Sequence, residues 1–197
     1  GLLAAAASRR SRRYLIVSGA AVTFVIWLPL LPVAGLTGTG QLEVHLIDVG
    51  QGDAIAVRLP DRRWLLFDAG RSWNGGDAGR REVIPYLRRR GGELYAFVLS
   101  HPHSDHVGGA ASVFRWLRPR VFFDAAYVAG NLDYLAALQL ARDKGIEWRR
   151  VRPGESIQIG GAVVEFLAPD SAWTAGLNDP NEASTVAKVR FGEVSIL

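Results

Sequence analysis

Residues 99–109, LSHPHSDHVGG, are the most informative stretch of this 197-residue chain. The apolar run YAFVL at residues 95–99 predicts a buried strand, and the Gly-Gly pair with the apolar residues after it predicts the start of a helix. Imidazole and carboxylate groups would then lie together at the C-terminal end of a strand. Zn(II), Mn(II) and Fe(II) accept both kinds of ligand, so four such groups at this spacing predict a metal site. Its candidate ligands are His101, His103, Asp105 and His106.

The composition excludes several classes of protein. Apolar residues make up 49% of the chain, which permits a sizeable core, and the absence of cysteine excludes disulfides, thiolate zinc sites and cysteine nucleophiles. It is also consistent with a location outside the cytoplasm. The formal net charge of +4 comes entirely from Arg9, Arg10, Arg12 and Arg13. The rest of the chain has equal numbers of acidic and basic residues, so its charge does not predict a polyanionic partner.

The region before residue 42 predicts a membrane anchor. Residues 14–36 contain no charged side chain, and about 20 apolar residues are enough to cross the hydrocarbon core of a bilayer as a helix. We predict a basic cytoplasmic segment at residues 1–13, a transmembrane helix at 14–36 and a linker at 37–41; a secretory signal peptide is the alternative. The arginines mark the cytoplasmic side, which places the following domain outside the plasma membrane. The chain starts without methionine, and we expect it to be a piece of a longer protein.

Residues 42–197 predict one domain that contains both strands and helices. Strands are expected at residues 42–49, 54–59, 64–68, 95–99, 120–124, 146–151, 156–159, 162–167, 185–191 and 194–197. Helices are expected at residues 82–90, 110–117 and 132–144, and residues 75–79 are expected to form a loop. Early antiparallel strands with helices interleaved later indicate an α/β fold, a sandwich of sheets flanked by helices.

Three motifs resemble those of the metallo-β-lactamase superfamily and of one branch within it. The HxHxDH motif at residues 101–106 follows a strand, and FDAG at residues 67–70 ends the strand meander before it. HLIDVGQGDA at residues 45–54, together with the predicted membrane helix, resembles the ComEC/Rec2 family of DNA-uptake channels of bacterial competence. The resemblance covers most of the chain. It implies an αββα fold, incomplete at its C-terminus, after the last membrane helix of the channel core.

The resemblance implies two divalent metal ions, zinc or manganese, in the complete protein. His101 and His103 are two residues apart and can face one metal, whereas the adjacent Asp105 and His106 diverge and would serve a second. Two metals about 3.5–4 Å apart suit phosphodiester hydrolysis. In the superfamily the residue that matches Asp105 also orients the nucleophilic water and takes up its proton, so Asp105 is the candidate catalytic residue. Asp68 matches a position that hydrogen-bonds the ligands or their loop; its alternative role is to cap a turn.

Four further residues are expected near the site. Asp48 and Asp53 flank glycines in a turn whose N–H groups could face an anion, although those glycines can equally supply positive φ for a tight connection. We expect both aspartates to support the site rather than to bind metal. A polar loop before the last predicted hairpin resembles a segment of ComEC-like domains and places Asn181 and Ser184 at the rim, in reach of substrate. A plain turn is the alternative for this loop.

The predicted site lacks some of the superfamily's ligands. The complete site takes further histidines and a bridging aspartate from beyond the HxHxDH loop, and no histidine follows His106 in this chain. The remaining histidine, His45, lies within a predicted strand and is expected to be an ordinary strand residue. We therefore expect a partial site, with weak metal binding and little hydrolysis by residues 1–197 alone.

Three functions are open at this point. The first is a metal-dependent phosphodiesterase or nuclease that acts on DNA at the mouth of an uptake channel. The second is a non-catalytic part of that channel which guides DNA, and the third is another metallo-β-lactamase-fold hydrolase, acting on a lactam, thioester or lactone. The membrane helix and the turn at residues 48–53 favour the first two. The implied partners are DNA (single-stranded or the non-transported strand), the plasma membrane and the rest of the channel core.

Overall fold

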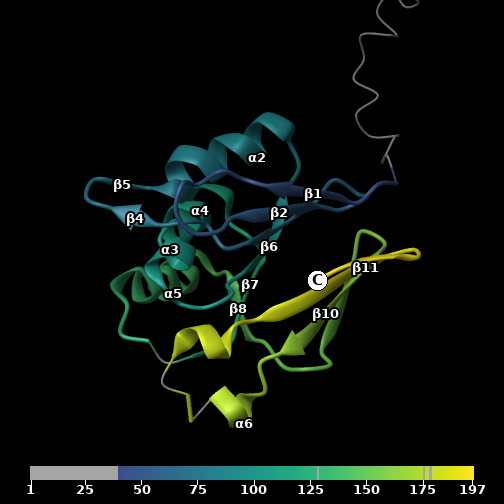
Figure 1. Cartoon of the computed structure of the whole chain (residues 1–197). Helices are drawn as coiled ribbons and strands as arrows, with labels where there is room; N and C mark the ends of the chain where they lie inside the picture. Colours follow the sequence, from purple (N-terminus) through teal and green to yellow (C-terminus); the bar gives the residue numbers. More distant parts are fainter. Residues whose placement is uncertain (1–39, 128, 175, 178) are drawn as a thin grey trace, which may run out of the picture. The chain divides into compact units, whose positions relative to one another are not determined.

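The computed structural model describes residues 40–127, 129–174, 176–177 and 179–197. The predicted basic segment, the predicted transmembrane helix and the linker up to residue 39 lie outside these residues. Among the residues described, no helix is both long enough and apolar enough to cross a membrane. The domain that starts at residue 40 is built from two larger sheets, a short hairpin and a group of helices (Figure 1).

A six-stranded sheet forms the middle of the domain, in the strand order β1-β2-β3-β6-β7-β8. The first three strands form an antiparallel meander, whereas β3, β6, β7 and β8 pair in parallel. Parallel neighbours need crossover connections, and the chain passes through at least one helix between each parallel pair. The strands are β1 (Glu43–Leu46), β2 (Ile55–Arg58), β3 (Trp64–Phe67), β6 (Leu94–Val98), β7 (Val121–Asp124) and β8 (Glu147–Arg150).

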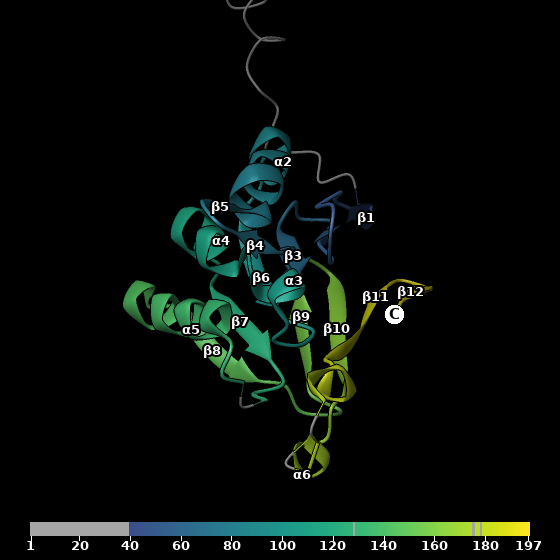
Figure 2. The same cartoon turned by 60° about the vertical axis from the view of Figure 1, so that its left-hand side comes forward.

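The helices cover one face of this sheet (Figure 2). They are a π-helical turn η2 (Gly79–Val83) that continues into α2 (Ile84–Arg90), then α3 (Ser104–Val107), α4 (Ala110–Leu117) and α5 (Leu132–Lys144). The first of these begins earlier than the sequence predicted, at residue 79 instead of 82. A short hairpin, β4 (Ser72–Trp73) with β5 (Gly76–Asp77), also includes residues that were expected to form a loop.

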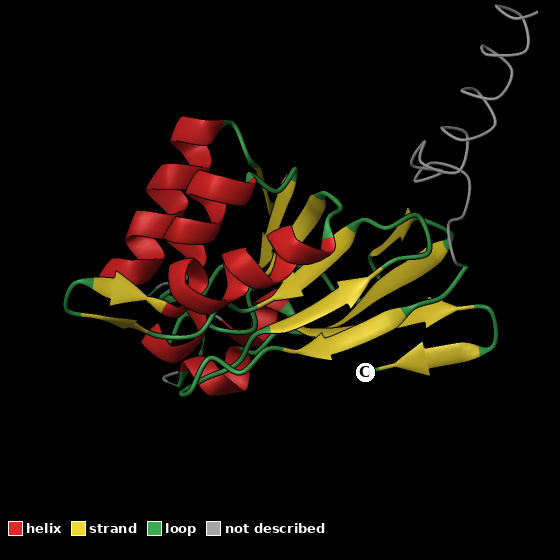
Figure 3. Cartoon of the chain, turned by 90° about the horizontal axis from the view of Figure 1, so that it is seen from above, coloured by secondary structure: helices red, strands yellow, loops and turns green. Residues whose placement is uncertain are grey.

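A second, antiparallel sheet packs on the other face, with the strand order β12-β11-β10-β9 (Figure 3). Its strands are β9 (Ser156–Ile159), β10 (Ala162–Ala168), β11 (Val186–Phe191) and β12 (Val194–Ile196), and the short helices α6 (Ser171–Thr174) and η3 (Pro180–Ala183) connect β10 with β11. The described residues therefore form one helical layer and two sheets. No second layer of long helices lies outside β9–β12 among these residues, and the αββα fold had been predicted as incomplete at its C-terminus.

Alternate residues of the central strands point into two different cores. Phe97 in β6 and Phe122 in β7 face the helices, and each ring centroid lies 5.1 Å from that of Phe114 in α4. Phe123 faces the opposite way, and its ring lies 4.8 Å from Phe166 of β10. The six-stranded sheet is thus buried on both faces, as is typical of parallel strands, and this rigid centre carries the ends of β3 and β6.

Glycines allow the loops after β3 and β6 to pack with their backbones in contact. A Cβ atom at Gly109, in the pair that follows HxHxDH, would lie 2.2 Å from the Ala69 carbonyl oxygen, and one at Gly79 would lie 2.2 Å from the Gly109 carbonyl oxygen. Two hydrogen bonds join the same segments, from Ala69 N–H to His106 O at 2.9 Å and from Gly109 N–H to Gly70 O at 3.1 Å. The Gly-Gly pair therefore permits this close approach and does not only precede a helix.

Asp124 ends β7 as a buried carboxylate. Tyr134 donates a hydrogen bond to its Oδ2 at 2.8 Å, and the Ala126 N–H donates to its Oδ1. Burial raises the pKa of Asp124 above its ordinary value, although the hydrogen bonds from Tyr134, Trp148 and Ala126 oppose that shift. The ionised form of Asp124 therefore disfavours folding, and the Tyr134 hydroxyl partly offsets this cost.

We expect Tyr134→Phe to lower the free energy of unfolding by about 1–3 kcal/mol at neutral pH, because a buried carboxylate loses a donor. The loss should grow with pH. A raised folded-state pKa means that stability is highest below the unfolded carboxyl pKa, about 3.9, and falls as the pH rises towards the folded value. Removing the donor raises the folded pKa further and steepens this fall.

Urea unfolding at about pH 4 and about pH 7 measures both effects. Tyr127→Phe is the control, because the Tyr127 hydroxyl donates to the Leu177 carbonyl at 3.2 Å and contacts no carboxylate in the described contacts. A destabilisation by Tyr134→Phe that is identical at both pH values would contradict the role assigned to the hydroxyl.

Candidate metal centre

The candidate site lies where β3 and β6 end side by side. These strands are parallel neighbours, so their C-terminal ends meet at one edge of the sheet, with Asp68 after β3 and the HxHxDH loop after β6. The Asp68 N–H donates to the Val98 carbonyl at 3.0 Å and extends this pairing by one residue. Asp68 then has a φ of 58°, a left-handed conformation that turns the chain away from the sheet and that aspartate tolerates better than most residues.

Asp68 is 4% exposed and is hydrogen-bonded through both carboxylate oxygens. Its Oδ1 accepts from the Ser100 N–H at 2.8 Å. Its Oδ2 accepts from the Ser100 hydroxyl at 2.6 Å and lies 2.7 Å from Nδ1 of His106. With a proton on Nδ1, His106 donates to Asp68 and keeps Nε2 available as a ligand atom. Asp68 therefore sets both the orientation and the tautomer of His106.

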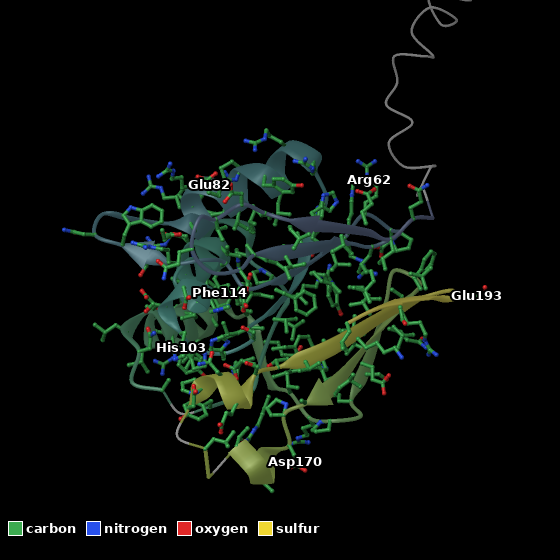
Figure 4. All side chains as sticks on the ribbon, viewed as in Figure 1. Arg62, Glu82, His103, Phe114, Asp170 and Glu193 are labelled. Atoms are coloured by element: carbon green, nitrogen blue, oxygen red, sulfur yellow. The ribbon has the colours of Figure 1, made fainter. Side chains whose placement is uncertain are left out.

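The three histidines of the motif lie against one another. Nε2 of His101 is 3.1 Å from Nδ1 of His103, and the ring centroid of His101 lies 4.2 Å from that of His106. His101 is buried, and the other two are partly exposed. His103 directly precedes α3 and is labelled in Figure 4. Nδ2 of Asn131 donates to the Pro102 carbonyl at 3.1 Å, which holds the loop against the start of α5.

The environment shifts the pKa values of two of these rings in opposite directions. Burial lowers the pKa of His101, and the neighbouring His106 lowers it further, so His101 is neutral at pH 7. Burial also acts to lower the pKa of His106, but the hydrogen bond and the charge of Asp68 outweigh it and raise the pKa, with help from Asp105 and Asp53. Metal ligation requires the neutral ring in each case.

Asp53 and Asp105 approach His106 from two sides. Oδ2 of Asp53 lies 3.8 Å from Nδ1 of His106, and Oδ2 of Asp105 lies 4.0 Å from its Nε2. Asp53, Asp68 and His106 together bring potential ligand atoms within 4.8 Å of one another. Asp68 already accepts hydrogen bonds on both oxygens, so among the carboxylates Asp53 and Asp105 are the better placed to bind a cation.

The remaining predicted site residues are placed differently. Oδ1 of Asp48 accepts from the Gly50 N–H at 3.0 Å and so caps its own turn, facing a separate cavity. Ser184 lines the cavity beside the histidines and donates its hydroxyl to the Asn181 carbonyl at 2.7 Å. The Asn181 N–H donates in turn to Asp179, and this bond lowers the pKa of Asp179. Asn178, the first residue of the predicted polar loop, lies outside the described residues.

Two residues of the site were not recognised from the sequence. Ser100 contacts Asp68 and also lies 3.0 Å from Nδ1 of His101, so it joins the two predicted groups. Thr185 donates its N–H to the Ser100 carbonyl at 2.8 Å. Ser100 lies inside the quoted motif, and its small hydroxyl between two ligand-bearing segments was the available signal. Thr185 is distant in the sequence, and no local pattern marks it.

A cavity of about 370 Å³ opens beside His101 and His106 between the two sheets. Asp53, Ser184 and Thr185 contribute polar groups to its wall, and apolar side chains of β1, β2 and β11 form much of the rest. Within the part of the chain that is described, Oγ1 of Thr185 is buried without a hydrogen-bond partner. A buried polar atom facing a cavity is available to a ligand or to water.

The donor set fits a divalent metal ion. Two nitrogen ligands of a tetrahedral zinc, each about 2.0–2.1 Å from the metal, are about 3.3–3.4 Å apart, and the ring nitrogens of His101 and His103 are 3.1 Å apart. The residues that line the cavity include no lysine or arginine, while three aspartates lie near it. His101, His103, His106 and Asp105 are thus the residues that could hold the metal, with Asp53 beside them.

We expect Asp68→Asn to lower metal affinity by about 10–100-fold. The free energy of unfolding should change less, because asparagine also tolerates a positive φ. The amide has one acceptor oxygen where Asp68 uses two, so its Nδ2 would face Nδ1 of His106 and favour the tautomer protonated on Nε2. Calorimetric titration with Zn²⁺ measures the change. Asp61→Asn, in an exposed hairpin, is the control. Wild-type affinity in Asp68→Asn would show that Asp68 does not set the His106 tautomer.

The sequence profile of the Metallo-beta-lactamase superfamily matches residues 47–180, more than half of the chain. The chain therefore belongs to the metallo-β-lactamase superfamily. Within that superfamily it is related to ComEC-type competence proteins, which confirms the resemblance inferred from its motifs.

Two curated relatives carry this relationship. "Recombination protein 2" of Haemophilus influenzae is 40% identical over 73 residues, 37% of this chain and 9% of the relative. "ComE operon protein 3" of Bacillus subtilis is 29% identical over 192 residues, 90% of this chain and 24% of the relative. The chain thus spans a quarter or less of the length of these proteins. The solved structure of metallo-beta-lactamase SMB-1 aligns with this chain with a TM-score of 0.52 at 18% sequence identity. The alignment covers 76% of this chain and 56% of the SMB-1 chain, and it supports the fold.

Proposed function

We propose that this domain is a metal-dependent phosphodiesterase that cleaves DNA during uptake across the cell membrane. The observation that carries the proposal is the cluster of three imidazoles and Asp105 beside a cavity, in which Asp68 holds His106 and Ser100 contacts His101. The relatives named for recombination and for the ComE operon favour a nucleic acid as the substrate.

Each residue of the cluster has a distinct role in this proposal. Two divalent cations, zinc or manganese, would supply Lewis acidity and a nucleophilic water. His101 and His103 would hold one cation, and His106 with Asp105 would hold the other. Asp105 also orients the attacking water and accepts its proton. Asp68 keeps Nε2 of His106 unprotonated, and Ser184, whose hydroxyl donates to the Asn181 carbonyl, forms part of the rim that the substrate would meet.

The cellular setting belongs to the same proposal. The apolar segment at residues 14–36 anchors the domain in the plasma membrane, and the preceding arginines place the domain on the extracytoplasmic side. The substrate is then single-stranded DNA, or the strand that is not transported, as it meets the channel core. Two cations would need ligands beyond these four residues to complete their coordination.

Cleavage of a labelled 20-nucleotide single strand by the purified full-length protein, with Mn²⁺, Zn²⁺ or excess chelator, tests the proposal, because residues 1–197 alone are expected to bind metal weakly. We expect cleavage with a metal and none with the chelator. Binding of the strand without cleavage under any condition would instead indicate a DNA-guiding domain, and hydrolysis of a chromogenic lactam without DNA cleavage would indicate a different hydrolase. Either result would overturn the nuclease assignment.

A further inference from the structure

A second cavity, of about 620 Å³, lies next to the metal centre and takes no part in the chemistry described above. Its wall is formed by the turn after β1 and by the segment that follows β3, and includes Asp48, Gln51, Arg71, Trp73, Arg81 and Glu82. The volume lies within the range of small-molecule sites, roughly 300–1,000 Å³. The cavity therefore has room for a ligand of the size of one nucleotide.

The turn at residues 50–53 separates this cavity from the metal centre. Gly50 and Gln51 face the cavity, whereas Asp53 faces His106. Gly52 lies directly on the backbone of Asp105, because a Cβ atom there would be 1.6 Å from the Asp105 carbonyl oxygen. A ligand in the cavity would thus be separated from the candidate metal centre only by the turn at residues 50–53.

Trp73 offers an aromatic surface at the cavity. It lies in the hairpin β4–β5 and is 36% exposed, although it is a large apolar side chain. Its ring packs against Gly76, where a Cβ atom would lie 3.0 Å from the indole nitrogen. Gly76, which pairs with Trp73 in the hairpin, has no side chain, so it contacts the indole ring without covering it.

Arg71 is the cation best placed to receive a phosphate there. Its Nη1 donates to Oε1 of Gln51 at 2.6 Å, and Gln51 is neutral. The charged neighbours are already engaged: Arg81 pairs with Glu82 at 3.0 Å, and Asp48 accepts from the Gly50 N–H. Among the described contacts, Arg71 has no carboxylate partner, so the amide of Gln51 orients its guanidinium while the charge is not neutralised.

We propose that this cavity binds one unpaired nucleotide of the substrate strand, with the base on Trp73 and a phosphate on Arg71. The inference rests on the proposed function and adds to it a binding site for one nucleotide whose base is free to stack. Aromatic stacking accepts every base and requires one that is not already stacked in a duplex. The nucleotide bound here is a close neighbour of the phosphodiester at the metal centre, and its position selects single strands.

Fluorescence anisotropy with a labelled ten-nucleotide thymidine strand, in excess chelator so that nothing is cleaved, tests this site. We expect Trp73→Ala to weaken binding by about 5- to 150-fold, the value of one stacked base, and Trp73→Phe to weaken it less. Trp116→Ala is the matched control, because Trp116 is 53% exposed on α4 and does not line this cavity. Binding by Trp73→Ala that equals that of the wild type would overturn the inference.

Three further probes separate the base from the phosphate. An abasic strand of the same length should bind equally to the wild type and Trp73→Ala, and a duplex should bind more weakly than the single strand. Arg71→Ala should weaken binding of both single strands and reduce the salt dependence by about one ion, whereas Arg89→Ala, on the exposed face of α2, should not. Equal binding of duplex and single strand, or no binding of any strand, would overturn the inference.

A uridine strand of the same length tests whether the site accepts RNA as well as DNA. The same dependence on Trp73 supports a site for an unpaired nucleotide of either sugar, and loss of binding with the 2′-hydroxyl restricts the site to DNA. Failure of this inference can be told apart from failure of the proposed function, because binding is measured without metal. Chelator-sensitive cleavage that does not depend on Trp73 keeps the nuclease and removes only the nucleotide site.

Discussion

Asp105→Asn is expected to lower the rate of metal-dependent DNA cleavage by about 10²–10⁴-fold, the usual contribution of a general acid or base. The side chain of Asp105 is 36% exposed, and its Oδ2 lies 4.0 Å from Nε2 of His106, the ring atom that faces away from Asp68. It is thus beside a candidate metal ligand and open to substrate. Asparagine keeps the size of the side chain and removes both its charge and its basicity.

Two measurements distinguish the roles assigned to Asp105. If it accepts a proton, the rate falls and calorimetric Mn²⁺ affinity changes little; if it binds metal, both fall. The control is Asp143→Asn, because Asp143 is an exposed residue of α5 that accepts from Gln139. Cleavage by Asp105→Asn at the wild-type rate, with the control also unchanged, would exclude Asp105 from the reaction.

Gly52→Ala should cause a large loss of both stability and metal binding. Gly52 has a φ of +87°, and an added Cβ atom would lie 1.6 Å from the carbonyl oxygen of Asp105 and 2.6 Å from its carbonyl carbon. These are backbone atoms that cannot rotate away, so the turn must separate from α3. We expect the free energy of unfolding to fall by about 3 kcal/mol, in addition to the strain of the left-handed conformation. Asp105 and His106 should also be displaced, which weakens metal binding.

Gly50→Ala isolates the contact from the strain. Gly50 lies in the same turn with a φ of +78°, but nothing lies within 4 Å of its added Cβ atom. This variant should lose only about 1–2 kcal/mol and retain the metal affinity of the wild type. Urea unfolding and Zn²⁺ titration of the two variants give the comparison. Equal losses for both would mean that the turn does not support the HxHxDH loop.

Much of the fold follows from local patterns in the sequence. The apolar runs before Asp68 and before His101 predict strands, and the Gly-Gly pair after His106 predicts the following helix, as the structure has them. The superfamily and the competence-related branch were likewise correctly inferred from the motifs. The hairpin β4–β5 was missed, because its strands have two residues each and lack a periodic pattern.

The identity of the donors could be inferred from the order of the residues alone. His101, His103, Asp105 and His106 are close in the chain, so any short loop after a strand keeps them within reach of one another. Their roles as ligands stay predictions that the proposed variants test. The same local argument could not rank Asp48, Asp53 and Asp68, because each is more than 30 residues from the loop it was expected to support.

That ranking depended on the pairing of β3 with β6. Parallel pairing sets Phe67 opposite Val98, so the Asp68 carboxylate accepts from the Ser100 N–H and lies 2.7 Å from Nδ1 of His106, while Asp48 caps its own turn. The same packing places Arg71 and Trp73 beside the turn at residues 48–51. Such contacts join residues that are distant in the chain. Strand register and backbone contact at glycines determine them, and neither can be read from a local pattern.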